Sequence, residues 1–203
     1  MSAPLAPSTN LAKYESGSRI LQWLIRRFHA RIGDVLAPHE FRTVLDVGCG
    51  EGFLSRVLLD RFPGIRLTGV DISPAAVERA RQRCPEGRFE VAPIESLAAM
   101  TERFDLVVCS EVLEHLDTPD AAVRLLAART KGLALLTVPW EPWFQAANFA
   151  RGKYLRSFGN HPEHVQRWSR GGFVRLLEPA FALLHAESLF PWSLCLARPR
   201  QES

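Results

Sequence analysis

The stretch TVLDVGCGEG, residues 43–52, constrains the fold of this chain more than any other. A short run of β-forming apolar residues leads into three glycines at alternate positions, Gly48, Gly50 and Gly52, and apolar residues at helical spacing begin at Phe53. This order predicts a buried strand, a glycine-rich turn and the start of a helix. Glycine lets the backbone pass close to a ligand, and the free N–H groups of a helix start attract electron-rich atoms. The stretch therefore predicts a nucleotide-binding turn.

The spacing of the glycines indicates which kind of nucleotide. A dinucleotide-binding turn has the pattern G-x-G-x-x-G, whose third glycine would fall at Phe53 in this chain. The pattern here is D-x-G-x-G-x-G, with Asp46 placed before the turn. A carboxylate at that place repels a pyrophosphate and suits a ligand that carries an ammonium group.

A second acid ends the next predicted strand. Asp71 closes residues 66–71 and lies twenty-five residues after Asp46, which suits one helix and two turns between neighbouring parallel strands. An acid at this place can accept both hydroxyls of a ribose, although strand-end acids often serve only in turns. Ser73 as the cap and Pro74 in the first turn then predict a helix that ends near Cys84.

Together these features resemble the class I S-adenosylmethionine (SAM)-dependent methyltransferases, over about residues 10–190. The resemblance implies SAM as cofactor and S-adenosylhomocysteine (SAH) as product. It places Ile94 against the adenine, although Ala92 and Pro93 stand where many relatives carry an acid. The predicted cofactor-binding residues are Asp46, Gly48, Cys49, Gly50, Gly52, Asp71, Ile72, Ile94, Ser110 and Glu111.

Strands and helices alternate along the chain. Strands are predicted at 43–47, 66–71, 87–92, 104–110 and 132–139, helices at 18–36, 52–62, 74–84, 119–129 and 172–177, and a terminal hairpin at 182–187 and 189–197. Regular alternation predicts an α/β fold with a parallel sheet and helices on both faces. With the resemblance, we expect a Rossmann-like, mostly parallel, seven-stranded sheet that ends in an antiparallel hairpin. The carboxyl ends of its strands, where Asp46, Asp71 and Glu111 fall, are expected to share one cleft.

Composition is ordinary for one globular domain. The chain has 203 residues, 47% of them hydrophobic and 23% charged. It has no apolar run near the roughly 18 to 20 residues that span a bilayer, and residues 1–10 do not resemble a signal peptide. The four cysteines show no CxxC spacing, so we expect reduced, mostly buried thiols and a cytoplasmic protein. Residues 18–203 are predicted to form one domain. Residues 1–17 would be a flexible leader, which folds over the cofactor as a lid if the resemblance holds or otherwise packs on the surface.

A segment at about 140–168 interrupts the alternation. Residues 139–170 hold seven of the nineteen aromatic residues and carry a net charge of +3, so the rest of the chain sums to zero. A long ordered insertion is usually functional, and we expect this one to cover the substrate. Its predicted substrate contacts are Trp140, Arg151, Tyr154 and His164. The alternative is a helical cap whose aromatic residues fill its own core.

The sequence E-x-x-E-H follows the strand at 104–110 and supplies Glu111, Glu114 and His115. Methyl transfer from SAM mainly requires that two reactants be positioned, and a hydroxyl acceptor also requires a base. His115 is the predicted general base, with Glu111 as the second catalytic candidate. The alternative is that Glu111 orients loops near the cofactor and His115 packs at a helix start.

A metal site is a further hypothesis, and it depends on resemblance alone. E-x-x-E-H resembles a string in small-RNA 3′-terminal 2′-O-methyltransferases and in some ubiquinone-pathway O-methyltransferases. In the RNA enzymes a later histidine before Trp-[Ser/Thr]-Arg completes the site, and here His164 precedes Trp168-Ser169-Arg170. The implied ligands are Glu111, Glu114, His115 and His164. Two carboxylates and two imidazoles suit Mn²⁺ or Zn²⁺ better than Mg²⁺.

The leading hypothesis is a SAM-dependent methyltransferase that acts on a small molecule, at oxygen. A metal-dependent RNA 2′-O-ribose methyltransferase is the first alternative, and the nearly neutral charge outside the insertion argues against a nucleic-acid partner without excluding one. A non-catalytic SAM-binding partner protein is the second. A nicotinamide-dependent oxidoreductase disagrees with the glycine spacing, and neither Tyr14 nor Tyr154 has a lysine four residues later. The oligomeric state is not predicted.

Overall fold

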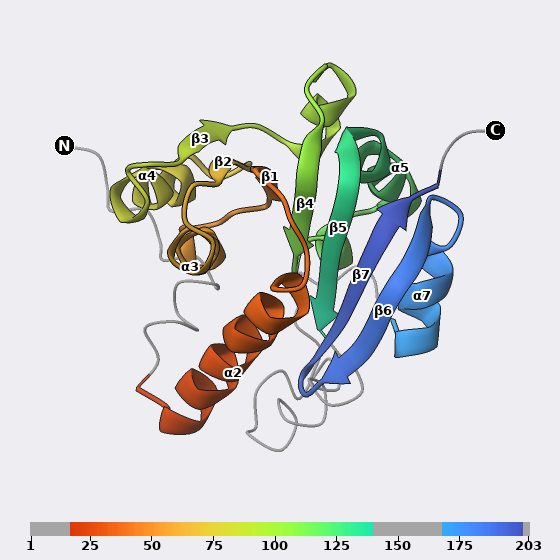
Figure 1. Ribbon diagram of the computed structural model, residues 1–203, viewed down its shortest axis with the longest axis horizontal. Helices are drawn as coiled ribbons and strands as arrows, with labels where there is room; N and C mark the ends of the chain where they lie inside the picture. The colour runs from red at the N-terminus through yellow and green to blue at the C-terminus, as the bar shows by residue number, and fades with distance from the viewer. Residues whose placement is uncertain (1–16, 140–167, 201–203) are drawn as a thin grey trace. The chain divides into compact units, whose positions relative to one another are not determined.

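The computed structural model describes residues 17–139 and 168–200 (Figure 1). Contacts divide the chain into two compact units, residues 1–94 and 95–203, and each is described by itself. The predicted leader (1–17, apart from Gly17) and insertion (140–168, apart from Trp168) lie outside the described residues. That residues 18–203 form one domain stays a prediction.

Helix α2 (Arg19–Leu36) opens the described part of the first unit. It begins where the sequence predicts, because the Oγ of Ser18 accepts the N–H of Leu21 at 3.4 Å and caps the helix start. Its apolar stripe buries Phe28 and Ile32, and the helix contacts α3 (Phe53–Arg61).

Three parallel strands form the first unit's part of the sheet: β1 (Thr43–Val47), β2 (Arg66–Asp71) and β3 (Arg88–Val91). β1 is buried along its whole length, as expected for a strand covered on both faces. Helix α4 (Pro74–Arg83) crosses from β2 to β3, and Ser73 caps it by accepting the N–H of Ala76 at 3.3 Å. In the register of these strands Asp46 lies beside Gly69, so the predicted parallel pairing of the strand that holds Asp46 with the strand that ends at Asp71 is confirmed.

The described residues of the second unit include the remaining strands and the α-helices before and after the insertion. β4 (Phe104–Ser110) is followed by the short 3-10 helix η2 (Leu113–His115), α5 (Pro119–Arg129) and β5 (Thr130–Pro139). After the insertion come α7 (Arg170–Leu177), capped by Ser169, and the hairpin of β6 (Phe181–Leu189) and β7 (Trp192–Pro199). β4 and β5 are parallel, whereas β7 pairs antiparallel with both β5 and β6.

The hairpin turn differs from the prediction. The sequence places Leu189 in the second strand, but β6 ends there and the turn falls at Phe190 and Pro191, which are joined by a cis peptide bond. A proline has no N–H to donate to a strand ladder, so the turn is its natural place. β5 also starts two residues earlier than predicted, at Thr130, whose hydroxyl donates to the carbonyl of Leu126 at 2.7 Å.

The strand order is β3-β2-β1-β4-β5-β7-β6 in a seven-stranded sheet. This confirms the predicted Rossmann-like α/β class with a mostly parallel sheet and a terminal antiparallel hairpin. All four cysteines carry free thiols and are buried, as the sequence predicts. In the ranges 17–139 and 168–200, no helix is both long enough and apolar enough to cross a bilayer.

Candidate functional site

The predicted glycine turn follows β1 directly. Gly48, Gly50 and Gly52 have φ angles of 72°, 52° and 76°, in the left-handed region that glycine adopts most easily. The N–H groups of Gly48 and Cys49 both donate to the carbonyl of Val70, at 2.8 and 3.1 Å. The turn is therefore attached to the end of β2, and its left-handed backbone explains the alternate glycines of the sequence.

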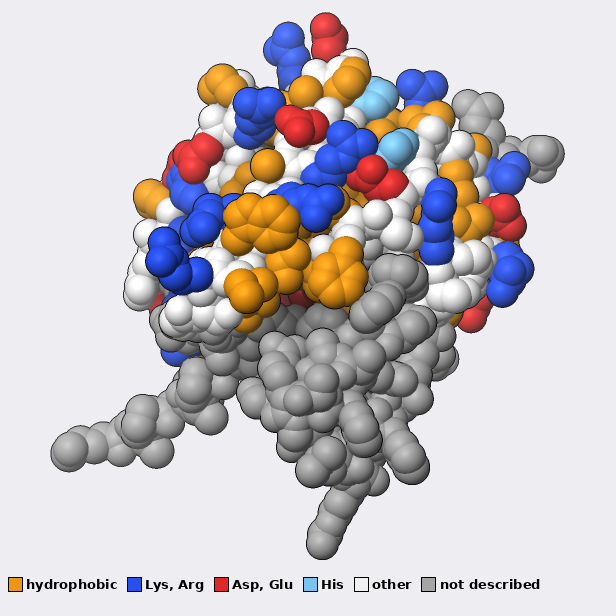
Figure 2. Space-filling model, turned by 90° about the horizontal axis from the view of Figure 1, so that it is seen from below, with side chains coloured by type: hydrophobic (Ala, Val, Ile, Leu, Met, Phe, Trp, Pro, Cys, Tyr) orange, Lys and Arg blue, Asp and Glu red, His pale blue; other side chains and the backbone are white. Residues whose placement is uncertain are grey.

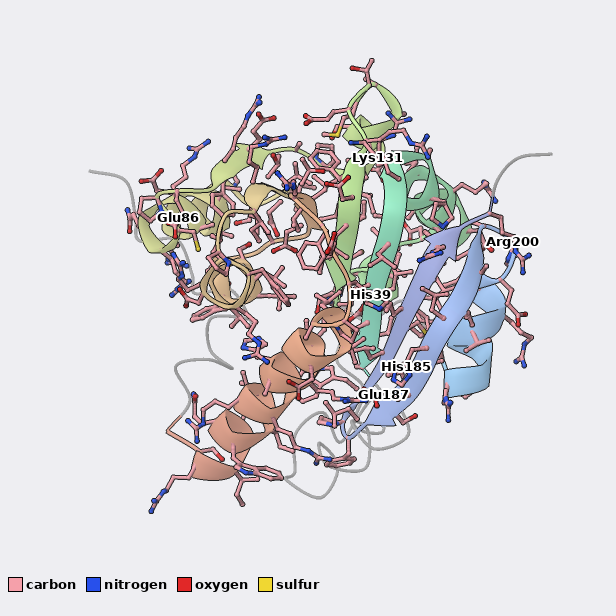
Figure 3. All side chains as sticks on the ribbon, in the orientation of Figure 1. His39, Glu86, Lys131, His185, Glu187 and Arg200 are labelled. Atoms are coloured by element: carbon pink, nitrogen blue, oxygen red, sulfur yellow. The ribbon has the colours of Figure 1, made fainter. Side chains whose placement is uncertain are left out.

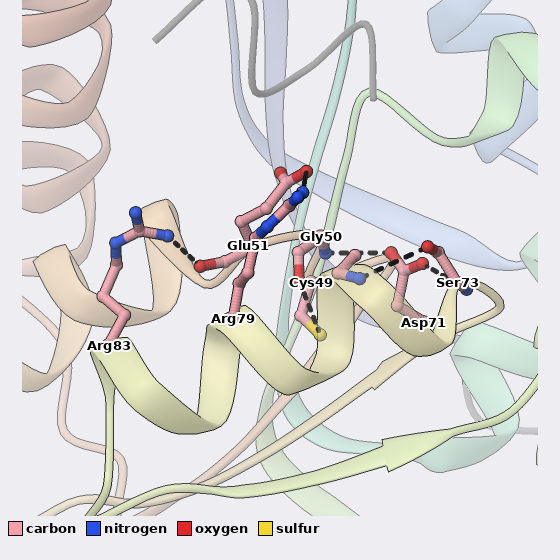
Figure 4. A network of polar contacts seen from close by, with 8 residues as sticks. Cys49, Gly50, Glu51, Asp71, Ser73, Arg79 and Arg83 are labelled. Carbon is pink, nitrogen blue, oxygen red and sulfur yellow. Dashed lines mark hydrogen bonds and ion pairs between the residues drawn. The ribbon is translucent and has the colours of Figure 1, made fainter. Parts of the chain in front are cut away.

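Asp71 connects this turn to the next helix (Figure 4). Its Oδ2 accepts the N–H of Gly50 at 2.8 Å, and its Oδ1 accepts the N–H of Ser73 at 2.9 Å. Both of these donors are backbone groups, so the position of the carboxylate is fixed by the chain itself. A carboxylate has about four lone-pair positions, so Asp71 can also accept hydroxyl groups from a ligand.

Asp46 is a buried carboxyl at the entrance of the same turn. It is 2% exposed and accepts a hydrogen bond from the Oγ of Ser55 at 2.5 Å. Burial raises the pKa of Asp46 from 3.8 to about 6, while the Ser55 hydrogen bond opposes the rise and the nearby charge of Asp71 adds to it. A cationic group beside Asp46 would favour its ionised form.

The three other predicted cofactor residues of this unit differ in exposure. Cys49 is buried in the turn, and burial together with the charges of Asp46 and Asp71 raises the pKa of its thiol far above the usual range. Cys49 therefore has the character of a small packing residue. Ile72 follows Asp71 and is 73% exposed, whereas Ile94 is 9% exposed. Of the two isoleucines, only Ile72 offers a large apolar surface to an adenine ring.

In the second unit, the predicted site residues lie at the end of β4. The hydroxyls of Ser110 and Thr137 are 2.8 Å apart, and the N–H of Glu111 donates to the carbonyl of Thr137 at 3.1 Å. Glu111 has a φ of 56°, a conformation that costs a non-glycine residue free energy and that recurs at functional sites. The indole N–H of Trp192 donates to the Oε1 of Glu111. Trp192 was not predicted from the sequence, because the two residues are 81 positions apart and no local pattern links them.

The two remaining residues of E-x-x-E-H have different environments. In η2, Glu114 is 1% exposed, whereas the side chain of the adjacent His115 is exposed. The described ranges contain no group of three or more His, Cys, Asp and Glu side chains arranged to hold a metal ion. Glu111, Glu114 and His115 alone therefore do not fit a metal. His164 lies outside the described residues, as do Trp140, Arg151 and Tyr154.

A histidine–carboxylate pair that was not predicted from the sequence lies on β6. His185 and Glu187 are two residues apart on one strand and so share a face, with 3.3 Å between Nε2 and Oε2 (Figure 3). Their spacing of two residues within a predicted strand could have indicated from the sequence that the two side chains lie on one face. The two side chains are 40% and 23% exposed.

The comparisons with known proteins agree with this fold and turn. The family described as "Methyltransferase domain" matches residues 18–180. That range is most of the chain, and the chain belongs to the class I SAM-dependent methyltransferases. The family predicted from the glycine turn and Asp71 is thus confirmed.

Individual relatives match shorter parts of the chain. A ubiquinone biosynthesis O-methyltransferase of Alkalilimnicola ehrlichii is 41% identical over 105 residues, which are 49% of this chain and 42% of that protein. A malonyl-[acyl-carrier protein] O-methyltransferase of Acetivibrio thermocellus is 35% identical over 94 residues, 46% of this chain and 33% of that protein. The chain thus spans less than half the length of both curated relatives. The N-methyltransferase NodS of Bradyrhizobium japonicum, solved with SAH, aligns with a TM-score of 0.65 over 88% of each chain; at 19% identity it shows the fold alone.

Proposed function

We propose that this chain is an enzyme that transfers a methyl group from SAM to an oxygen atom of a small-molecule acceptor. One observation carries the proposal: in a member of this family, Asp71 holds Gly50 of the left-handed glycine turn at 2.8 Å and keeps lone pairs for a ligand. Such a turn presents N–H groups and carboxylates side by side. A nucleoside that also carries an ammonium group matches that chemistry.

The residues of the first unit fit the parts of SAM. Asp46 would face the ammonium group, and Asp71 would accept the ribose hydroxyls. Ile72 would cover the adenine with Ile94 behind it, and the backbone of the turn (Gly48, Cys49, Gly50 and Gly52) would line the nucleoside. Bound SAM supplies a methyl group that the adjacent sulfonium has already activated.

The proposed acceptor is an oxygen nucleophile, because both relatives reported above are named O-methyltransferases. A hydroxyl must lose its proton as the new O–CH₃ bond forms, and His115 is the proposed base. Its exposed side chain can pass that proton to water. We propose that Glu111, fixed by Trp192, orients the acceptor beside His115, and that Trp140, Arg151, Tyr154 and His164 contact it.

The RNA alternative has less support among the described residues. It depends on a metal that these residues do not assemble by themselves. On the face seen in Figure 2, acidic and basic side chains are interspersed, whereas nucleic-acid surfaces gather basic ones. A small-molecule acceptor therefore remains the proposal.

Isothermal titration calorimetry with SAM and with SAH on metal-stripped protein, repeated with added Mn²⁺, tests the proposal. We expect both ligands to bind without metal, with a Kd of about 1 µM, or about −8 kcal/mol. If neither binds, the assignment of the turn is wrong. A separate Mn²⁺-binding event that His164→Ala removes would support the four-ligand site and the RNA alternative. SAM binding without methyl transfer to any phenol or carboxylate tested would favour a non-catalytic SAM-binding protein.

A further inference from the structure

The later part of α4 packs against residues 51–53 of the glycine turn. A Cβ placed on Gly52 would lie 3.0 Å from the Cα of Ala80, closer than real Cβ atoms normally approach backbone. The Sγ of Cys84 lies 3.6 Å from the carbonyl oxygen of Gly52. The helix and the turn are thus in direct contact, and glycine at position 52 permits it.

Two arginines on the same side of this helix contact the turn (Figure 4). Arg83 donates a hydrogen bond from Nη1 to the carbonyl oxygen of Glu51, and the Nη1 of Arg79, one helical turn earlier, lies 3.9 Å from Glu51 Oε1. The guanidinium of Arg83 also lies 3.6 Å from the ring centroid of Phe53, the first residue of α3. Arg83 therefore contacts the residues on both sides of Gly52.

Glu51 is buried, so its contacts with the two arginines matter for the stability of the turn. Its side chain is 1% exposed, although it lies in a turn between two glycines. Burying a carboxyl group away from water costs free energy unless cations or donors lie close to it, and Arg79 provides a cation. Without the arginines, the Glu51 carbonyl would lose a charge-assisted hydrogen bond and the turn would gain conformational freedom.

We propose that Arg79 and Arg83 are positioning residues for the cofactor, which hold Glu51 and Phe53 so that the N–H groups of the turn keep the orientation that SAM requires. This inference rests on the proposed function. It assigns α4 two attachments to the turn: its start, at Ser73, is joined through Asp71 to Gly50, and its end is joined through Arg83 to Glu51. Preorganising a binding loop raises affinity because less entropy is lost when the ligand binds. The arginines act through the turn and need not touch SAM.

Arg81 of the same helix offers a matched control. It donates to the carbonyl oxygen of Phe89 at 3.1 and 2.8 Å and so joins α4 to β3. Arg83→Met and Arg81→Met each remove an arginine-to-carbonyl interaction from α4, but only the first frees the turn. We expect Arg83→Met to raise the Kd for SAM about tenfold and Arg81→Met to change it by less than about twofold. Because its ion pair is long and partly exposed, Arg79→Gln should raise it only about two- to threefold.

Hydrogen exchange of the amides of residues 48–53 supplies a readout that does not require SAM. It should be faster in Arg83→Met than in the wild type, and unchanged in Arg81→Met. Equal SAM affinity and equal exchange in the wild type and Arg83→Met would overturn the inference. If the wild type fails to bind SAM, the proposed function fails, while the exchange comparison still tests the attachment. If Arg83→Met does not fold, Arg83→Lys takes its place, because it keeps the charge but loses the planar guanidinium that stacks on Phe53.

Discussion

Two carboxylates at the ends of parallel strands, Asp71 as the last residue of β2 and Glu111 directly after β4, are held in different ways. Asp71 accepts hydrogen bonds from the backbone N–H groups of Gly50 and Ser73, at 2.8 and 2.9 Å. Glu111 has a left-handed φ of 56° and accepts a hydrogen bond from the side chain of Trp192, 81 positions away. Backbone donors are present whatever the side chains are, whereas a tryptophan can be replaced. In the proposed roles, the backbone therefore fixes the carboxylate on the cofactor side, whereas a single side-chain contact holds the carboxylate on the acceptor side.

The largest effect is expected from Asp71→Ala. This change removes the proposed acceptor for the ribose hydroxyls and also the carboxylate that accepts the N–H of Gly50. Two hydrogen bonds to a charged group contribute about 1.5–3 kcal/mol each, so SAM affinity should fall about a thousandfold. Titration calorimetry measures this, with Glu78→Ala, an exposed acid on α4, as the control. Unchanged affinity in Asp71→Ala would contradict the ribose assignment.

His115→Gln tests the acceptor side. If His115 is the base, kcat should fall about 100-fold, within the usual range for general-base catalysis. The Kd for SAM should stay the same, because the substitution lies in the second unit and the proposed nucleoside contacts lie mainly in the first. Single-turnover kinetics and calorimetry on one preparation separate the two quantities. A loss of SAM affinity with normal kcat would instead place His115 on the cofactor side.

Trp192→Phe tests the long-range contact of Glu111. It removes the indole N–H, so the Glu111 carboxylate loses this donor. Trp192 itself is only 5% exposed. The free energy of unfolding, measured with urea, should fall by about 1–3 kcal/mol. Trp23→Phe is the matched control, because Trp23 is 53% exposed and should change stability by less than about 0.5 kcal/mol. If Trp192→Phe also weakens SAM binding, Glu111 serves the cofactor as well as the acceptor.

The contrast between Asp71, which backbone groups hold, and Glu111, which a distant side chain holds, also separates what the sequence could predict from what it could not. The turn around Gly50 is encoded locally, because left-handed backbone strongly favours glycine. The capping residues Ser18, Ser73 and Ser169 likewise mark the helix starts. Contacts between residues that are far apart in the sequence leave no comparable local pattern. The hydrogen bond from Trp192 to Glu111 depends on the hairpin register, and the approach of Arg83 to Glu51 depends on how α4 packs. Local conformation could therefore be predicted, whereas the side-chain contacts that fix the site could not.

The smallest expected effect is a change of SAM affinity with pH, caused by the titration of Asp46. Its pKa is about 6 in the folded state against 3.8 ordinarily, so its protonated form contributes stability below about pH 3.8 that is lost as the pH rises through about 6. An ammonium group favours the ionised form, so binding of SAM should strengthen as the pH rises through about 6. The affinity should rise about tenfold between about pH 5 and pH 7 and level off above that. Calorimetry across this range tests the expectation, and in Asp46→Asn, which keeps an acceptor for Ser55, the pH dependence should disappear. A wild-type affinity that does not change with pH would show that Asp46 does not face the ammonium group, and the cofactor side would then depend on Asp71 and the turn alone.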